Sequence, residues 1–239
     1  MPRFFMDIEA ADTVTVTGQD ARHIACSLRM KAGDTLVLCN GHGTDFDCRI
    51  LSALPDEVVL QVTAARDTTA EPTVAVTLYQ GLPKADKLEW IIQKAVELGA
   101  CRIVPVVTAR SIARPGENED KKTARRQKIA DEAAGQSGRG ILPQVEPPIS
   151  FKAAAARMAA ENTVVFYECG GEPLGRVIAD CPNALSVFIG PEGGIAPDEL
   201  ETLKAGGAAV ATLGPRILRC ETAPIAALAA IMALTGNMD

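Results

Sequence analysis

Two stretches near the C-terminus decide the fold: FIGPEGGIAPDEL, residues 188–200, and LGPRILRCETA, residues 213–223. Each begins at the end of a short apolar run of strand length, at 185–189 and 209–213, and leads into a run of helical composition. In an open α/β sheet, ligands bind in the crevice outside the carboxyl ends of the strands. The two loops therefore predict one shared binding crevice.

The same alternation of strands and helices extends back to residue 73. We expect further strands at 74–79, 102–107 and 163–167, and helices at 86–98, 122–134, 150–162, 197–204 and 222–234. A strand, a helix and a second strand in succession favour a parallel pair joined by a crossover. Residues 73–239 are thus predicted to form one α/β domain.

Residues 1–70 have a different pattern, which is typical of a small β-rich domain. Short alternating segments are separated by tight turns such as Asn40-Gly41-His42-Gly43. The expected strands are 12–17, 35–39, 46–51 and 58–63, with one short helix at 20–28. Strands of this kind favour a small barrel, which a linker at 67–72 separates from the α/β domain.

The composition limits the functional classes. A net charge of −6 argues against promiscuous nucleic-acid binding but leaves a local basic surface open. There is no signal-peptide pattern and no apolar run of membrane-spanning length, so we expect a cytoplasmic protein without membrane contact. The seven cysteines, Cys181 among them, form no C-x-x-C pair, and His23 and His42 are the only histidines, so no metal site is expected. Nucleotide-binding and serine-hydrolase signatures are also missing.

The two C-terminal loops carry groups that suit a ligand. Three glycines in Gly190–Gly194 let backbone N–H groups approach a bound molecule, although a tight strand-to-helix turn explains them as well. The second loop brings two arginines together with Ile217 and Leu218, whose apolar side chains suit a flat adenine. Glu221 and Thr222 there also suit the cap of the last helix, and both interpretations can hold at once.

A basic stretch between residues 109 and 139 is the candidate phosphate-contacting surface. Eight basic residues stand there against five acids: Arg110, Arg114, Lys121, Lys122, Arg125, Arg126, Lys128 and Arg139. A solvated helix face is the alternative interpretation. Arg3 and Arg29 would extend this surface from the barrel.

Taken in order, these motifs resemble the RsmE-type 16S rRNA (uracil-N3) methyltransferases of the SPOUT superfamily, over most of the chain. The matching segments are Pro2–Phe5, His23–Arg29 with Gly33-Asp34, Lys84, Glu89-Trp90, Lys94–Gly99, Ala109–Ser111, Glu132–Arg139, Gly190–Gly194 and Leu213–Ala223. Cys220 departs from the pattern, in which Thr is usual.

The resemblance implies a trefoil-knotted SPOUT domain with a mostly parallel sheet at 73–239, preceded by a PUA-like, RNA-binding β-barrel at 1–70. It implies S-adenosyl-L-methionine as cofactor, 16S rRNA or the small ribosomal subunit as substrate, and a homodimer. The implied cofactor-binding residues are Phe166, Tyr167, Glu168, Gly190, Pro191, Glu192, Gly193, Leu213, Gly214, Ile217, Leu218, Arg219, Thr222 and Ala223. The implied RNA-binding residues are Arg3, Arg29, Lys84, Arg110, Arg125, Arg126 and Arg139.

Methylation of uracil N3 requires loss of its proton, so a positive field that stabilises the uridinate is expected. We hypothesise that Arg219 and Arg139 supply this field and that Glu221 positions a partner. Two alternatives stay open: a non-catalytic rRNA-binding protein, and a SPOUT methyltransferase that modifies a tRNA ribose.

Overall fold

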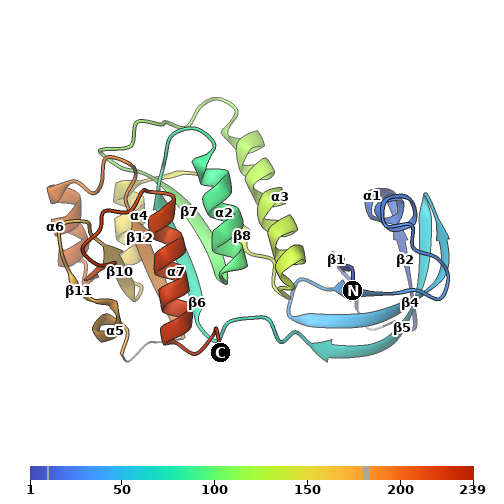
Figure 1. The fold of residues 1–239 in the computed structure, drawn as a ribbon. Helices are drawn as coiled ribbons and strands as arrows, with labels where there is room; N and C mark the ends of the chain where they lie inside the picture. The colour runs from blue at the N-terminus through green and yellow to red at the C-terminus, as the bar shows by residue number, and fades with distance from the viewer. Residues whose placement is uncertain (10, 180–182) are drawn as a thin grey trace. The chain divides into compact units, whose positions relative to one another are not determined.

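The computed structural model describes residues 1–9, 11–179 and 183–239, so Cys181 lies outside the described residues. The chain forms two compact units (Figure 1). The first consists of Met1–Glu71 and Ala134–Leu142, and the second of Pro72–Ala133 and Pro143–Asp239. The sequence predicts a single boundary near residue 70, and it gives no hint that residues 134–142 group with the N-terminal unit.

The first unit is a five-stranded sheet in the order β1-β3-β4-β5-β2. Its strands are β1 (Arg3–Phe5), β2 (Thr13–Thr17), β3 (Thr35–Cys39), β4 (Thr44–Leu54) and β5 (Glu57–Asp67). Helix α1 (Gly18–Arg22) continues into the π-helical turn η1 (His23–Ser27). Two register shifts between β4 and β5 bend the long hairpin, because an extra residue in one strand increases its twist. The apolar residues that alternate along these strands form one buried cluster inside the curled sheet.

The second unit is built on a parallel sheet in the order β11-β13-β10-β12-β6-β7-β8, with β9 paired to β7. The strands are β6 (Ala75–Gly81), β7 (Ala100–Val107), β8 (Gln144–Val145), β9 (Ile149–Ser150), β10 (Thr163–Phe166), β11 (Glu172–Pro173), β12 (Ala184–Ile189) and β13 (Ala209–Thr212). The helices are α2 (Lys87–Glu97), α3 (Glu119–Ser137), α4 (Phe151–Met158), α5 (Leu174–Val177), α6 (Pro197–Ala205) and α7 (Thr222–Leu234). The expected parallel pairing of the first two strands of this domain is confirmed in β6 and β7.

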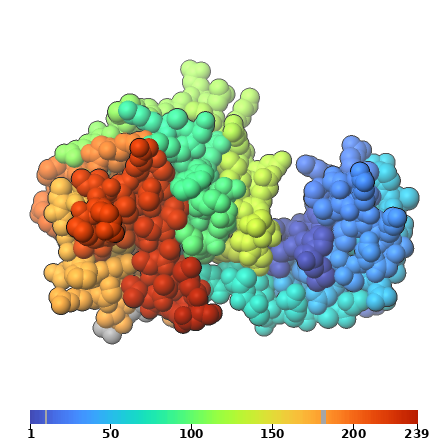
Figure 2. All heavy atoms as spheres, viewed as in Figure 1, coloured from blue at the N-terminus to red at the C-terminus, as the bar shows by residue number. Residues whose placement is uncertain are grey.

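Helices cover both faces of this sheet. Side chains of α4 and α6 join those of the central strands in one apolar cluster. On the other face α2 and α7 lie side by side, and both helices are visible at the surface of the unit (Figures 1 and 2). Buried apolar residues recur at helical spacing along α2, which explains why this segment is a helix. Of the helices that the structure describes, none has the length and hydrophobicity that crossing a bilayer requires.

The strand order decides where the functional loops meet. Strand β10 lies between β12 and β13, and all three run in parallel. Phe166, the last residue of β10, is in register with Ile189 of β12 and Ala211 of β13. The loops that follow the three strands therefore leave the sheet at one edge.

Candidate functional site

A cavity of about 570 Å³ opens at this edge of the sheet. Its wall is made by the ends of β10, β12 and β13, the loops after them and the start of α2. The lining residues are Lys87, Phe166, Tyr167, Glu168, Ile189, Gly190, Pro191, Glu192, Gly193, Gly194, Thr212, Leu213, Gly214, Arg216, Ile217, Leu218, Arg219, Cys220 and Ala223. The crevice expected from the sequence is present, and the segment after β10, which the family resemblance implied, lines it together with the two C-terminal loops.

The Gly190 loop, residues 190–194, is held close to its neighbours. Arg110 donates from Nη1 to the carbonyl of Gly193 at 2.9 Å, and Gly194 N donates to the carbonyl of Pro191 at 2.9 Å. Gly194 has a φ of +72°, and a Cβ at this position would overlap the carboxylate of Glu168. The positive φ favours glycine, and a larger residue would in addition require the Glu168 side chain to move.

The Leu213 loop, residues 213–221, places apolar and basic side chains at the mouth of the cavity. Ile217 is 83% exposed, which is unusual for a large apolar side chain, and Arg216 and Arg219 are exposed beside it. The carbonyl of Arg219 accepts from Thr222 N at 2.8 Å and Ala223 N at 2.9 Å, and this turn begins α7. The loop therefore presents an unburied apolar surface and two free-standing cationic side chains to the cavity.

Glu221 does not cap α7 through its side chain, so that part of the capping interpretation is wrong. Its carboxylate instead lies 3.0 Å from Nζ of Lys87, and the same ammonium lies 3.2 Å from Oε1 of Glu192. The Cys220 thiol donates to Oε2 of Glu221 at 3.2 Å, and Nζ of Lys87 lies 3.8 Å from its sulfur. Four ionisable side chains thus meet at one side of the cavity.

These contacts fix the charge states of the cluster. Hydrogen bonds to Glu221 and Glu192 raise the pKa of Lys87, and the bond from Lys87 lowers the pKa of Glu221. Burial opposes ionisation of Glu192, yet bonds from backbone N–H groups and from Lys87 bring its pKa below the usual value. Burial, together with the bond to Glu221, raises the pKa of Cys220 to about 12. At neutral pH the cluster holds one ammonium, two carboxylates and a neutral thiol, so Cys220 is not a nucleophile.

The structure brings together nearly all of the cofactor-binding residues expected from the sequence. Every one of them lines the cavity except Thr222, which lies just inside α7. Gly194, Arg216 and Cys220, which lie in the two predicted cofactor loops, line the cavity as well, whereas no motif had indicated Lys87, Ile189 or Thr212. Lys87 could have been found from topology, because β6 pairs with β12 and the segment after β6 must lie beside the Gly190 loop.

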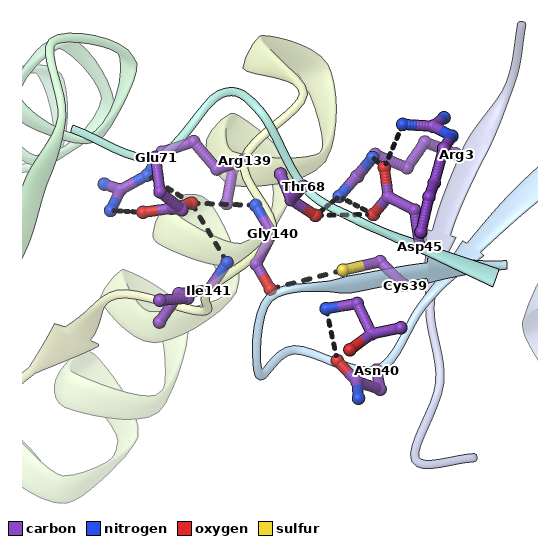
Figure 3. A network of polar contacts seen from close by, with 12 residues as sticks. Arg3, Cys39, Asn40, Asp45, Thr68, Glu71, Arg139, Gly140 and Ile141 are labelled. Carbon is purple, nitrogen blue, oxygen red and sulfur yellow. Dashed lines mark hydrogen bonds and ion pairs between the residues drawn. The ribbon is translucent and has the colours of Figure 1, made fainter. Parts of the chain in front are cut away.

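The three residues expected to act in catalysis have different surroundings. Arg219 lines the cavity, and Glu221 lies next to it in the ionic cluster. Arg139 belongs to the first unit, where its side chain is 2% exposed and its guanidinium donates to Glu71 at 2.8 and 3.3 Å (Figure 3). This geometry favours a structural role for Arg139.

The residues expected to bind RNA divide into two groups. Arg29, Lys84, Arg110 and Arg125 are exposed, although Arg125 also pairs with Glu89 and Arg110 donates to the carbonyl of Gly193. Arg3, Arg126 and Arg139 are held in ion pairs within the protein, and their side chains are 11%, 11% and 2% exposed. Arg3 makes two bonds to Asp45, at 2.6 and 2.8 Å (Figure 3). The first group alone is accessible to a phosphate.

Comparison with known proteins identifies the family. Residues 69–232 match a family model described as an RNA methyltransferase domain, and residues 16–63 match one described as an RNA methyltransferase PUA domain. The chain is 38% identical to ribosomal RNA small subunit methyltransferase E of Bacillus subtilis, covering 97% of this chain and 96% of the relative. It is 32% identical to the protein of that name from Mycobacterium tuberculosis, covering 99% and 93%.

Solved structures agree with this result. Ribosomal RNA small subunit methyltransferase E from Neisseria gonorrhoeae, crystallised with S-adenosyl methionine, superposes with a TM-score of 0.90 at 32% identity, covering 98% of both chains. A methyltransferase from Legionella pneumophila, also with S-adenosyl methionine bound, gives 0.86 at 27% identity, covering 97% and 96%. The expected SPOUT fold with a mostly parallel sheet, preceded by a PUA-like unit, is confirmed, and the N-terminal sheet is curled into a half-barrel where the sequence predicts a barrel. The chain belongs to the family of ribosomal RNA small subunit methyltransferase E.

Proposed function

We propose that the protein transfers the methyl group of S-adenosyl-L-methionine to N3 of a uridine in 16S rRNA. The observation that carries the proposal is the cavity at the carboxyl ends of β10, β12 and β13 in a chain of this family. Two structural relatives of this fold hold S-adenosyl methionine, and the curated relatives are named for the small-subunit ribosomal RNA.

The residues of the cavity fit this cofactor. The volume of about 570 Å³ lies within the range of roughly 300–1,000 Å³ that is usual for small-molecule sites. Exposed Ile217, together with Leu218, offers an apolar surface to an adenine, and the Gly190 loop lets backbone N–H groups approach a ligand closely. Carboxylates of Glu168 and Glu192 suit hydroxyl donors and a positively charged sulfur.

The protein must favour the uridinate, which is the uridine without its N3 proton, and must align N3 with the methyl group. S-adenosylmethionine supplies a methyl group on a cationic sulfur that a nitrogen anion can attack. Arg219, a cation at the cavity wall, stabilises the negative charge that develops on the uracil when N3 loses its proton. Glu221 is held ionised by Lys87, and its lowered pKa makes it a weaker base than an ordinary carboxylate. We therefore assign Glu221 to positioning.

The partners follow from the surfaces of the two units. The outer face of α7 carries Ile225, Ala226, Ala229 and Ala230, which are only half-buried, and Leu234, which is 56% exposed. An apolar helix face of this kind suits a second copy of the chain, in line with the expected homodimer. The N-terminal unit and the four exposed basic residues bind the RNA, and the enzyme works in the cytoplasm.

The experiment that tests the proposal is mass spectrometry of small-subunit rRNA from cells with and without the gene. Loss of one N3-methyluridine, restored by the wild-type gene, is the expected result. Arg219→Ala should lower kcat about 100-fold in vitro, as removal of a group that stabilises developing charge does. A chain that binds rRNA but leaves every methylated uridine unchanged would instead be a non-catalytic binding protein, and a lost ribose methyl in tRNA would identify the other alternative.

A further inference from the structure

Lys87 is a charged residue of the cavity wall that contacts two carboxylates, Glu192 and Glu221. It is the first residue of α2, and its ammonium lies 3.2 Å from Glu192 and 3.0 Å from Glu221. Glu192 belongs to the Gly190 loop and Glu221 to the Leu213 loop. One side chain therefore joins three segments that are far apart in the sequence. We call this arrangement the Lys87 bridge.

The segment that leads to Lys87 is packed closely on the Gly190 loop. Lys84 N donates to Oε1 of Glu192 at 3.1 Å. A Cβ on Gly81 would come within 2.5 Å of Cδ of Pro191, so the backbone of β6 touches this loop. These contacts hold the Gly190 loop, and Glu192 with it, in place against β6 and the segment after it.

The Leu213 loop has less support. All of its residues are described, and at its end Nζ of Lys87 donates to the sulfur of Cys220 and pairs with the carboxylate of Glu221. The other side-chain bonds join Thr212 to Gly214 at the start of the loop, with distances of 3.1 and 3.4 Å. Apart from the turn that begins α7, Lys87 is therefore the residue whose side chain links the end of the loop to the rest of the cavity.

We propose that Lys87 is a positioning residue for methyl transfer: by joining Glu192 to Glu221 it sets the width of the cofactor cavity and the place of Arg219. The inference rests on the proposed function. Arg219 lines the cavity two residues before Glu221, so a shift of this part of the loop would displace both side chains. A displacement of about 1 Å is enough to impair a reaction that requires alignment.

The size of the effect follows from the exposure of the bridge. The side chains of Lys87, Glu192 and Glu221 are 35%, 28% and 20% exposed, so solvent screens each pair. An isolated ion pair of this kind contributes little to stability. A single lysine that pairs with two carboxylates, however, loses its side-chain entropy only once for two interactions. We therefore expect a loss of about tenfold in cofactor affinity, within the range that networks of exposed charges reach.

The test compares Lys87→Met with Lys94→Met in the full-length protein. Lys94 lies on the same helix, is 34% exposed and makes a 2.7 Å ion pair with Glu97 away from the cavity, so it is a matched control. Calorimetry with S-adenosylhomocysteine should give a Kd about tenfold higher for Lys87→Met and unchanged for Lys94→Met. The thermal midpoints of the two variants should agree.

Two further readouts separate positioning from a general loss of structure. Lys87→Arg should recover affinity to within about threefold of wild type, because a guanidinium can serve both carboxylates. Lys87→Met and Glu221→Gln should be non-additive, since each breaks the same bridge. In turnover, Lys87→Met should raise KM for the cofactor and lower kcat, whereas Lys94→Met should change neither.

The outcomes distinguish the inference from the function. If wild type binds S-adenosylhomocysteine and Lys87→Met binds it equally well, the Lys87 bridge has no positioning role and the proposed function stands. If wild type itself fails to bind, the proposed function is wrong and the inference falls with it. Should Lys87→Met fold poorly, Glu221→Gln provides the same comparison from the other side of the bridge, and unchanged affinity there overturns the inference.

Discussion

Replacement of Glu71 by glutamine should release the segment around residue 140. Oε1 of Glu71 accepts from Gly140 N at 2.8 Å, from Ile141 N at 3.0 Å and from Nε of Arg139 at 3.3 Å, while Oε2 accepts from Nη2 of Arg139 at 2.8 Å (Figure 3). One carboxylate thus fixes three successive residues. Glutamine has nearly the shape of glutamate. Its NH₂ group, however, would face either the guanidinium of Arg139 or the backbone N–H groups of Gly140 and Ile141, and none of these donors can accept a hydrogen bond from it.

The free-energy cost of Glu71→Gln follows from the burial of the two paired side chains. The side chains of Arg139 and Glu71 are 2% and 17% exposed, so this is a buried pair with one slightly accessible partner. Removal of one member of a buried pair costs about 3–5 kcal/mol, and the accessibility of Glu71 favours the lower end. A loss of about 3 kcal/mol corresponds to roughly a 100-fold increase in the population of the open segment.

Hydrogen exchange measured by mass spectrometry is the suitable assay, because the amides of Gly140 and Ile141 themselves donate to Glu71. Exchange there should accelerate about 100-fold in Glu71→Gln. Asp56→Asn is the control: Asp56 pairs with Arg22 at 3.2 Å, and these side chains are 87% and 70% exposed, so the change should be less than about fivefold. Equal exchange in the two variants would refute the structural role of the Glu71 pair.

The same pair predicts a dependence on pH. Burial alone would raise the pKa of Glu71, but the hydrogen bonds and charge of Arg139 and the bonds from Gly140 and Ile141 lower it below the usual 4.5. A carboxylate with a lowered pKa stabilises the folded state above its unfolded pKa and loses that contribution as the pH falls through the folded pKa. Protection of Gly140 and Ile141 in wild type should therefore be constant from neutral pH down to about 5 and should decrease in more acidic solution. Glu71→Gln should lack this decrease.

Two further predictions concern the cavity and the thiols. Gly194→Ala should weaken binding of S-adenosylhomocysteine about tenfold by calorimetry, because the φ of +72° strains an alanine and the new Cβ displaces the carboxylate of Glu168 from its place in the cavity wall; unchanged affinity would show that the loop adapts. Iodoacetamide at pH 8 should alkylate exposed Cys26 and Cys169 in the native protein, while Cys220, with its pKa raised to about 12, should react only after unfolding. Labelling of Cys220 in the native protein, detected by peptide mass spectrometry, would contradict the burial of this thiol.

The parts of the fold that the sequence predicts are those that depend on local patterns. Alternation and helical periodicity located the main strands and helices, and the crevice followed from the direction of parallel strands. Strands β4 and β5 run longer than the apolar alternation indicates. Their ends are held by polar partners across the hairpin, such as Arg66 with Asp45 at 3.3 Å and Asp47 at 3.4 Å, which a hydrophobic pattern does not register.

The basic residues show the limit of reasoning from composition. A run of arginines in an acidic chain suggested a phosphate-contacting surface, but Arg139 is neutralised by a carboxylate 68 residues away. Arg3 is likewise bound by Asp45, 42 residues away. Partners at such separations are chosen by the tertiary fold, so the sequence cannot tell an accessible arginine from a buried one.

Lys87 was missed for a related reason, and its role can be separated into charge and position. Without its ammonium, Glu192 and Glu221 would keep two uncompensated negative charges at the cavity wall. If charge alone mattered, Lys87→Met would strengthen binding of cationic S-adenosylmethionine relative to S-adenosylhomocysteine, which lacks the sulfonium charge. If Lys87 positions the Leu213 loop, both ligands should lose affinity by a similar factor. The ratio of the two dissociation constants, measured at two salt concentrations, therefore decides between an electrostatic and a positional role.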